Sequence, residues 1–116
     1  LPLNLEMPEA FSVANQKVDG HLCSTLSATN RLGIYPVISG SIAQGNIKRL
    51  SSFQTKKLGD GFTSDAQRAL NITRSAPGIA CALIGMKQTA HIKENLRLCS
   101  FPLLEPDIFE VLMKNG

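Results

Sequence analysis

Lys87 lies at the junction between a predicted strand and a predicted helix, and a junction of this kind can bind an anion. The run from Ile79 to Ile84 is almost entirely apolar, as in a strand covered on both faces, and Gly85 ends it. Thr89 can cap the helix that follows. Because a helix N-terminus offers unpaired N–H groups and a partial positive charge, a phosphate beside Lys87 is one interpretation. A structural turn that binds nothing is the other, and the pattern alone favours it.

The end of an earlier predicted strand offers a second place for a ligand. The run from Ile34 to Ser39 is apolar, and the small residues from Gly40 to Gly45 follow it. Ligands of α/β proteins lie at the carboxyl ends of parallel strands, so we expect a site where these two strands end.

Catalytic and metal-binding arrangements are not predicted for this chain. Neither His21 nor His91 has a serine or cysteine partner in a recognisable motif, and neither lies at a metal-binding spacing from a cysteine. Tyr35, the one tyrosine, falls inside a predicted strand and is interpreted as structural. The three cysteines form no C-x-x-C pair, and we expect buried, reduced thiols.

Composition predicts one folded domain, because 43% of the 116 residues are hydrophobic and 18% are charged. The net charge of +3 is too small and too dispersed to indicate a nucleic-acid partner. No apolar run reaches the roughly 18 residues of a membrane span and no signal peptide is visible, so we expect a soluble, cytoplasmic protein without a membrane partner. The chain begins at Leu1 rather than methionine, almost directly with a strand, which suggests a fragment.

Apolar runs and helical periodicity predict the order of elements. The predicted strands are short and apolar, and they cover residues 1–5, 34–39 and 79–84. The predicted helices are amphipathic, and they cover residues 20–32, 65–75, 89–99 and 107–114. Strands that alternate with helices predict an α/β fold with a parallel sheet and right-handed crossovers.

Local patterns add detail to this order. We expect residues 6–19 to form a loop with one helical turn near 9–13, and residues 46–62 to form a long loop over the site, helical near 47–53, or else a disordered loop. Ser64 and Gln67 predict a capping box for the helix that follows. The inward positions of the last three helices are predicted to be Ala66, Ala69, Leu70 and Thr73, then Ile92, Leu96 and Cys99, then Ile108, Val111 and Leu112.

Three long segments resemble the end of aldo/keto reductases. LPLNLEMPEAF is similar to the sixth strand of that family and the loop after it, and LGIYPVISGSIAQG is similar to the seventh strand. SDAQRALNITRSAPGIACALIGMKQTAHIKENL resembles the seventh helix, eighth strand and eighth helix. The resemblance implies the C-terminal part of a parallel (β/α)8 TIM barrel, with about three strand–helix units and a C-terminal helix. As one partial domain, the chain then divides into a strand and loop (1–19), a helix, strand and pyrophosphate-type loop (20–45), a long loop (46–62), a helix–strand–helix unit (63–100) and a final helix (101–116).

The resemblance also implies a cofactor, NADP. In this family the pyrophosphate lies at the end of the seventh strand, the 2′-phosphate at the end of the eighth, and the adenine against the eighth helix. The residues at the matching positions are Ser39, Gly40, Ser41, Ile42, Gly85, Met86, Lys87, His91, Glu94 and Asn95.

Two of these residues depart from the family pattern. Ser39 stands where many members have a tyrosine that stacks on the nicotinamide, and His91 stands where an arginine is frequent. A neutral imidazole is a poorer phosphate partner than a guanidinium, so preference for NADP over NAD does not follow from the pattern. Glu94 and Asn95 match adenine contacts, although Glu94 can instead pair with Arg97 and Asn95 can instead bond to backbone.

The resemblance implies an oxidoreductase that reduces small-molecule carbonyls to alcohols by hydride transfer. Its catalytic Asp, Tyr, Lys and His come from strands earlier than any present here, so this segment alone is predicted to be inactive. The expected partner is the missing N-terminal part or another copy of the chain, which would cover open strand edges. The alternatives are a non-catalytic nucleotide- or phosphate-binding α/β module that needs a partner or oligomer, and a fragment that folds by oligomerisation and binds no ligand.

Overall fold

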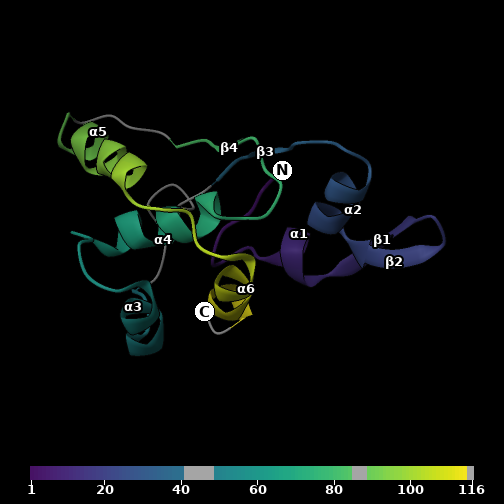
Figure 1. Cartoon of the computed structure of the whole chain (residues 1–116), viewed down its shortest axis with the longest axis horizontal. Coiled ribbons are helices and arrows are strands. Elements are labelled where there is room, and N and C mark those ends of the chain that lie inside the picture. Colours follow the sequence, from purple (N-terminus) through teal and green to yellow (C-terminus); the bar gives the residue numbers. More distant parts are fainter. Residues whose placement is uncertain (41–48, 85–88, 115–116) are drawn as a thin grey trace.

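The computed structural model describes residues 1–40, 49–84 and 89–114 (Figure 1). Within these ranges the chain is a mixed α/β structure with six α-helices and two small sheets of two strands each. The elements in chain order are α1 (Glu9–Ser12), β1 (Ala14–Val18), β2 (His21–Ser24), α2 (Thr25–Arg31), β3 (Val37–Ile38), α3 (Ser52–Leu58), α4 (Asp65–Arg74), β4 (Cys81–Ala82), α5 (Thr89–Leu96), a 3₁₀ helix (Arg97–Ser100) and α6 (Pro106–Lys114).

Three short segments run parallel to one another near the centre of the molecule. β3 pairs with β4, with Val37 opposite Cys81. The first residues of the chain join the other edge of β3 through a parallel bridge between Pro2 and Ser39, in which Ser39 N–H donates to Leu1 O over 2.9 Å. The predicted parallel arrangement is therefore confirmed for these segments, but the strands are shorter than predicted and the described residues do not close a barrel.

A β-hairpin occupies the region where the sequence predicts a loop followed directly by a helix. β1 and β2 pair antiparallel around Asp19 and Gly20, which both have positive φ, of 51° and 81°. That pair of conformations is the one an Asp-Gly hairpin turn adopts, so the prediction of a loop over residues 6–19 is wrong for Ala14–Val18. The helix prediction from residue 20 is also wrong at its start, because Ser24 Oγ accepts from Ser27 N–H over 3.1 Å and so caps α2 at Thr25.

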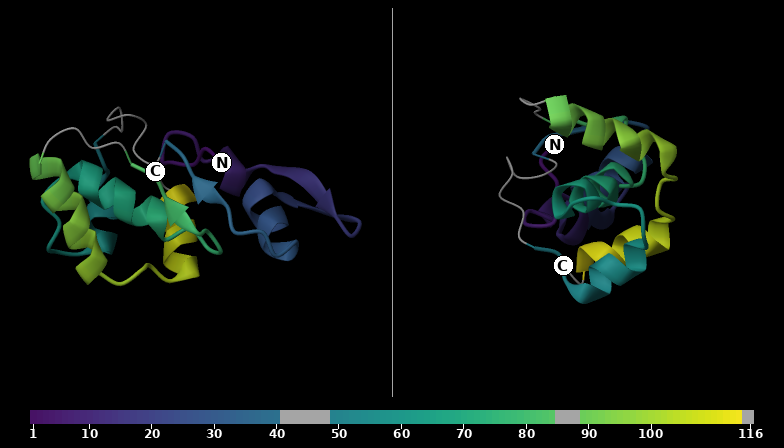
Figure 2. Two further views of the ribbon diagram at one scale, coloured as in Figure 1. Left: turned by 90° about the horizontal axis from the view of Figure 1, so that it is seen from above. Right: turned by 90° about the vertical axis from the view of Figure 1, so that its left-hand side faces the viewer.

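The hairpin forms one end of an elongated molecule whose principal extents are 46, 28 and 24 Å (Figure 2). The hairpin and α2 share a small apolar cluster, made by Val18, Cys23 and Ala28. Helices α3 to α6 gather at the other end, and α4 lies between α5 and α6 (Figures 1 and 2).

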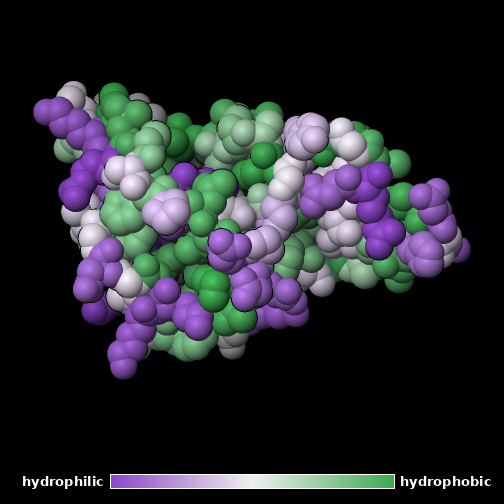
Figure 3. All heavy atoms as spheres, viewed as in Figure 1, coloured by the Kyte–Doolittle hydropathy of each residue, from purple (hydrophilic) through white to green (hydrophobic). Residues whose placement is uncertain are grey.

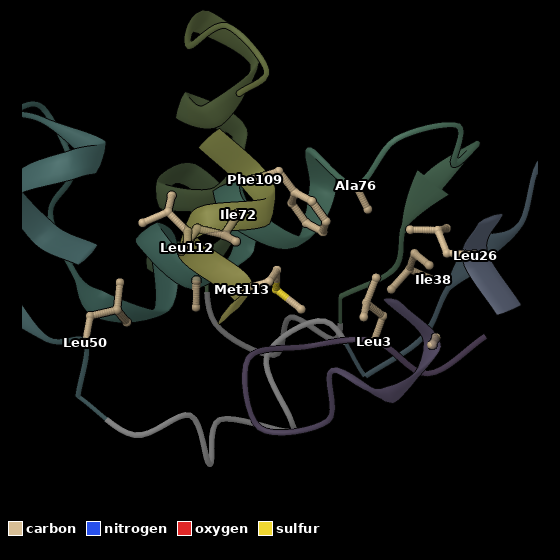
Figure 4. Packing of buried hydrophobic residues seen from close by; sticks show 11 residues of the cluster. Leu3, Leu26, Ile38, Leu50, Ile72, Ala76, Phe109, Leu112 and Met113 are labelled. Atoms are coloured by element: carbon tan, nitrogen blue, oxygen red, sulfur yellow. The ribbon is translucent and has the colours of Figure 1, made fainter. Parts of the chain in front are cut away.

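The main core joins the parallel segments to α4 and α6. Leu3 and Ile38, from neighbouring parallel segments, are fully buried, as are Ile72 of α4 and Phe109 and Leu112 of α6 (Figure 4). Burial of such side chains is the largest favourable term in folding, at about 1.5–3 kcal/mol for each. α6 therefore holds α4 against the parallel segments, and the predicted helix over residues 107–114 is confirmed within one residue.

The parallel segments are covered on one side only, and the expectation of strands buried on both faces is wrong. Ile38 is fully buried, whereas Val37 is 43% exposed and Leu83 is 56% exposed. Figure 3 shows hydrophobic atoms at the surface around β3 and β4. The physical reason is that the described helices pack against the side that carries Ile38.

Helices α4 and α5 differ from their predicted faces. In α4, Ala69, Leu70 and Thr73 are buried as predicted, but Ala66 is exposed. In α5 the predicted face is wrong, since Ile92 is 39% exposed and Leu96 is 61% exposed. The residues of α5 that are partly buried are those at 94 and 95.

The cap of α4 differs from the predicted capping box. Ser64 caps α4 through Gln67 N–H, but the Gln67 side chain accepts from Thr63 N–H over 2.7 Å instead of closing the predicted box with Ser64. A complete capping box is present at α3, between Ser51 and Gln54.

The three cysteines are free. Cys23 is buried, but Cys81 and Cys99 are exposed, so the predicted burial is wrong for these two. In the described part of the chain no helix is long and apolar enough to cross a membrane.

Candidate functional site

The carboxyl ends of the first two parallel segments meet at Ser39 and Gly40. Ser39 is held by its N–H bond to Leu1 O, and its own carbonyl accepts from Leu3 N–H over 3.3 Å. Gly40 follows with φ of 65°, a conformation that residues other than glycine rarely adopt. Both residues are exposed, so the end of β3 presents small, accessible groups at the position that the sequence predicts for the site.

Asn4 is the residue that joins these two strand ends, and sequence reasoning missed it. Its side chain is 1% exposed, and its Nδ2 donates to Gly40 O over 2.7 Å. Its Oδ1 accepts from the N–H groups of Glu6 and Met7, each over 2.8 Å. Asn4 thus satisfies three backbone groups and fixes the turn that leaves the first segment. An asparagine inside the predicted strand over residues 1–5 was the available signal, but its partner Gly40 lies 36 positions away in the sequence.

The predicted adenine contacts lie on α5, where Glu94 holds α5 against α4. Glu94 accepts a hydrogen bond from Ser64 Oγ, and its backbone carbonyl accepts from Gln67 Nε2 over 2.7 Å. Gln67 is fully buried, so this contact is part of the packing of the two helices. The alternative pairing of Glu94 with Arg97 is not found among the ion pairs of the described residues. Asn95 is partly buried beside it.

His91 is exposed on α5, so its side chain is accessible to a ligand or to solvent alike. The predicted contacts Ser41, Ile42, Gly85, Met86 and Lys87 lie outside the described residues. The structure therefore brings Ser39 and Gly40 together with Asn4, and Glu94 together with the start of α4.

Arg74 secures the far end of α4. Its Nε donates to Asn71 Oδ1 and its Nη2 donates to Phe101 O, each over 2.8 Å. Burial lowers the pKa of the Arg74 guanidinium, and the nearby Cys99 acts in the opposite direction. Arginine stays protonated in proteins despite such a shift, so Arg74 acts as a fixed donor that ties α4 to the segment before α6.

The described ranges contain no group of three or more His, Cys, Asp or Glu side chains placed to hold a metal ion. Tyr35 is 73% exposed. Its side chain has no described partner that would make it an acid or base.

Comparisons with known proteins identify no relative: no family model, no curated protein and no solved structure matches the chain. The resemblance to aldo/keto reductases therefore rests on the sequence segments quoted above and stays a prediction.

Proposed function

We propose that this chain is the cofactor-binding C-terminal segment of an NADP-dependent oxidoreductase similar to aldo/keto reductases. The observation that carries the proposal is the parallel order of residues 1–3, β3 and β4, with α2 and α4 in the intervening chain. This order is what the sixth, seventh and eighth units of a (β/α)8 barrel require. The mixed α/β structure alone is compatible with many other folds, so the barrel is part of the proposal.

The exposed side of the parallel segments also supports a larger assembly. Val37 and Leu83 are apolar and exposed, and inward-facing residues of barrel strands are of this kind. The remaining strands of a barrel would cover them. Without those strands the chain contains no described set of acid, base and nucleophile, so catalysis belongs to the intact protein.

The residues present fit a dinucleotide cofactor. Ser39 and Gly40 end β3 with small, exposed groups that allow close approach of a pyrophosphate. The chain after β4 enters α5 at Thr89, and a helix start of this kind favours a phosphate group. NADPH, when bound, supplies the hydride for carbonyl reduction. Ser39, Gly40 and α5 contribute by binding and orienting it.

Calorimetric titration of the purified chain with NADPH, NADH and adenosine 2′,5′-bisphosphate tests the proposal. We expect NADPH to bind and the bisphosphate to compete with it. Lys87→Gln should weaken NADPH by about tenfold, the usual effect of losing one charge-assisted hydrogen bond, and should leave NADH nearly unchanged. Lys57→Gln, on α3, is the matched control and should change neither affinity.

Absence of NADPH binding would contradict the proposal. Binding of inorganic phosphate without any preference for the dinucleotide would instead favour the alternative of a non-catalytic phosphate-binding module. Equal effects of the two lysine variants would show that the affinity reflects net charge rather than a site.

A further inference from the structure

A cavity of about 390 Å³ lies between α3 and the first turn of α4, and none of its lining residues is among those proposed to bind NADP. We call it the α3–α4 cavity. Its lining residues are Arg49, Leu50, Ser52, Thr55, Lys56, Asp65 and Arg68. Its volume falls in the range of about 300–1,000 Å³ that small-molecule sites occupy. Figure 1 shows α3 close to the beginning of α4, and residues of both helices line the cavity.

The charge in this cavity is unbalanced. Three lining side chains are cationic and one is anionic, which leaves a net charge of +2. Both carboxylate oxygens of Asp65 already accept hydrogen bonds. One accepts from Arg68 Nη1 over 2.8 Å, and the other accepts from Leu50 N–H over 3.2 Å. Among the residues that the structure describes, Arg49 and Lys56 have no ion-pair partner.

The bonds of Asp65 fix the position of Arg68. The Arg68 side chain is 22% exposed, and its Nη2 reaches Phe62 O at 3.4 Å, near the limit for a hydrogen bond. Its Nε is buried and has no partner in the described ranges. Nη1 and Nη2 each carry a second N–H group beyond these bonds, and a guanidinium held in one orientation loses little entropy when it binds an anion.

The α3 helix start is not the source of this site. Ser51 and Gln54 form a complete capping box there, which uses the N–H groups of these two residues. The donors available to a ligand are the side chains of the cavity. The hydroxyls of Ser52 and Thr55 lie on the same lining and can donate to oxygen atoms between the cations.

We propose that the α3–α4 cavity binds a small phosphate monoester or inorganic phosphate, as a site separate from the proposed NADP site. A dianion neutralises the net charge of +2, and cations of this kind give the strong, charge-assisted hydrogen bonds that phosphate oxygens accept. The proposal does not depend on NADP binding, because none of its residues belongs to the predicted cofactor contacts.

The test is an NMR titration of the ¹⁵N-labelled chain with inorganic phosphate at low, constant ionic strength. Amide signals of Ser52, Thr55 and Arg68 should move in a saturable way. Arg49→Gln and Lys56→Gln should each weaken phosphate by about fivefold or more. Lys57→Gln changes the same charge on the same helix outside the cavity and should leave the affinity as in the wild type.

Three results of this titration would overturn the proposal: no saturable shift in the wild type, the same affinity in the Arg49 and Lys56 variants as in the wild type, or an equal loss in the Lys57 variant. A repeat of the titration with NADP present separates this site from the cofactor site. Unchanged phosphate shifts support a separate site, and displacement of phosphate by NADP contradicts it. Failure of NADPH to bind in calorimetry would overturn the proposed function and leave this site intact.

Discussion

Replacing Asn4 by aspartate tests how the ends of the parallel segments are held together. The substitution keeps the size of the side chain and its oxygen acceptor for the N–H groups of Glu6 and Met7. It removes the Nδ2 group, which donates a hydrogen bond to Gly40 O over 2.7 Å. The new carboxylate would then face that carbonyl at a position that is 1% exposed.

The expected cost follows from this geometry. Leaving a buried polar group without its partner costs about 1–3 kcal/mol, and placing a carboxylate beside a carbonyl oxygen adds to that cost. Gly40 itself is exposed, so water can compensate part of the loss. We expect Asn4→Asp to lower the free energy of unfolding by about 2 kcal/mol.

Asn30→Asp is the matched control. Asn30 also donates to a backbone carbonyl, that of Pro77, but the bond is longer, 3.2 Å, and the residue is exposed. The same exchange of amide for carboxylate there should cost less than about 1 kcal/mol. Urea unfolding followed by circular dichroism measures both variants. Equal losses, or an Asn4 variant as stable as the wild type, would refute the role assigned to Asn4.

Three further predictions test the packing around α4. Phe109→Ala empties a fully buried position and should cost about 3–5 kcal/mol in urea unfolding, with Phe109→Leu losing clearly less; equal losses would contradict close packing there. Arg74→Lys keeps the charge but not both hydrogen bonds, so we expect a loss of about 1 kcal/mol and faster amide exchange near Phe101, and unchanged exchange would argue against that link. Gly78→Ala introduces a Cβ at φ of 77° that would collide with the side chain of Asn30, at the end of α2. The Cβ of Gly33→Ala, at φ of 72°, would meet nothing within 4 Å. Thermal unfolding should therefore show the larger loss of stability for Gly78→Ala, and equal losses would contradict the collision.

Sequence patterns predict the parallel order but not the extent of pairing. The apolar runs around Ile38 and Ala82 mark β3 and β4 because such runs are typical of strands in parallel sheets. Each strand has only two residues, and apolar residues in or next to these strands, Val37 and Leu83, are exposed. Pairing length depends on the segments that cover a strand, and an apolar run alone cannot show which of its faces is covered.

The hairpin and the face of α5 were missed for different reasons. The Asp19-Gly20 turn signal is present in the sequence, but the polar residues of β1 lack the alternation that usually marks a strand. In α5, the spacing of Ile92 and Leu96 predicts an inward face, yet the contacts of Ser64 and Gln67 turn Glu94 toward α4. Local periodicity carries no information on such polar contacts between distant helices.

The candidate site shows the same limit. Ser39 and Gly40 are exposed at the end of β3, and the end of an apolar strand can be located from the sequence. Asn4 could not be found in this way, since its role depends on a bond to Gly40 across two segments.

Hydrogen exchange measured by mass spectrometry, with and without NADP, tests the central claim most directly. If the chain binds the cofactor as proposed, NADP should slow exchange in peptides that contain Ser39–Gly40 and in those that cover the start of α5, with no change in the β1–β2 hairpin. Protection confined to the hairpin or to α6, or no protection at saturating NADP, would contradict the account.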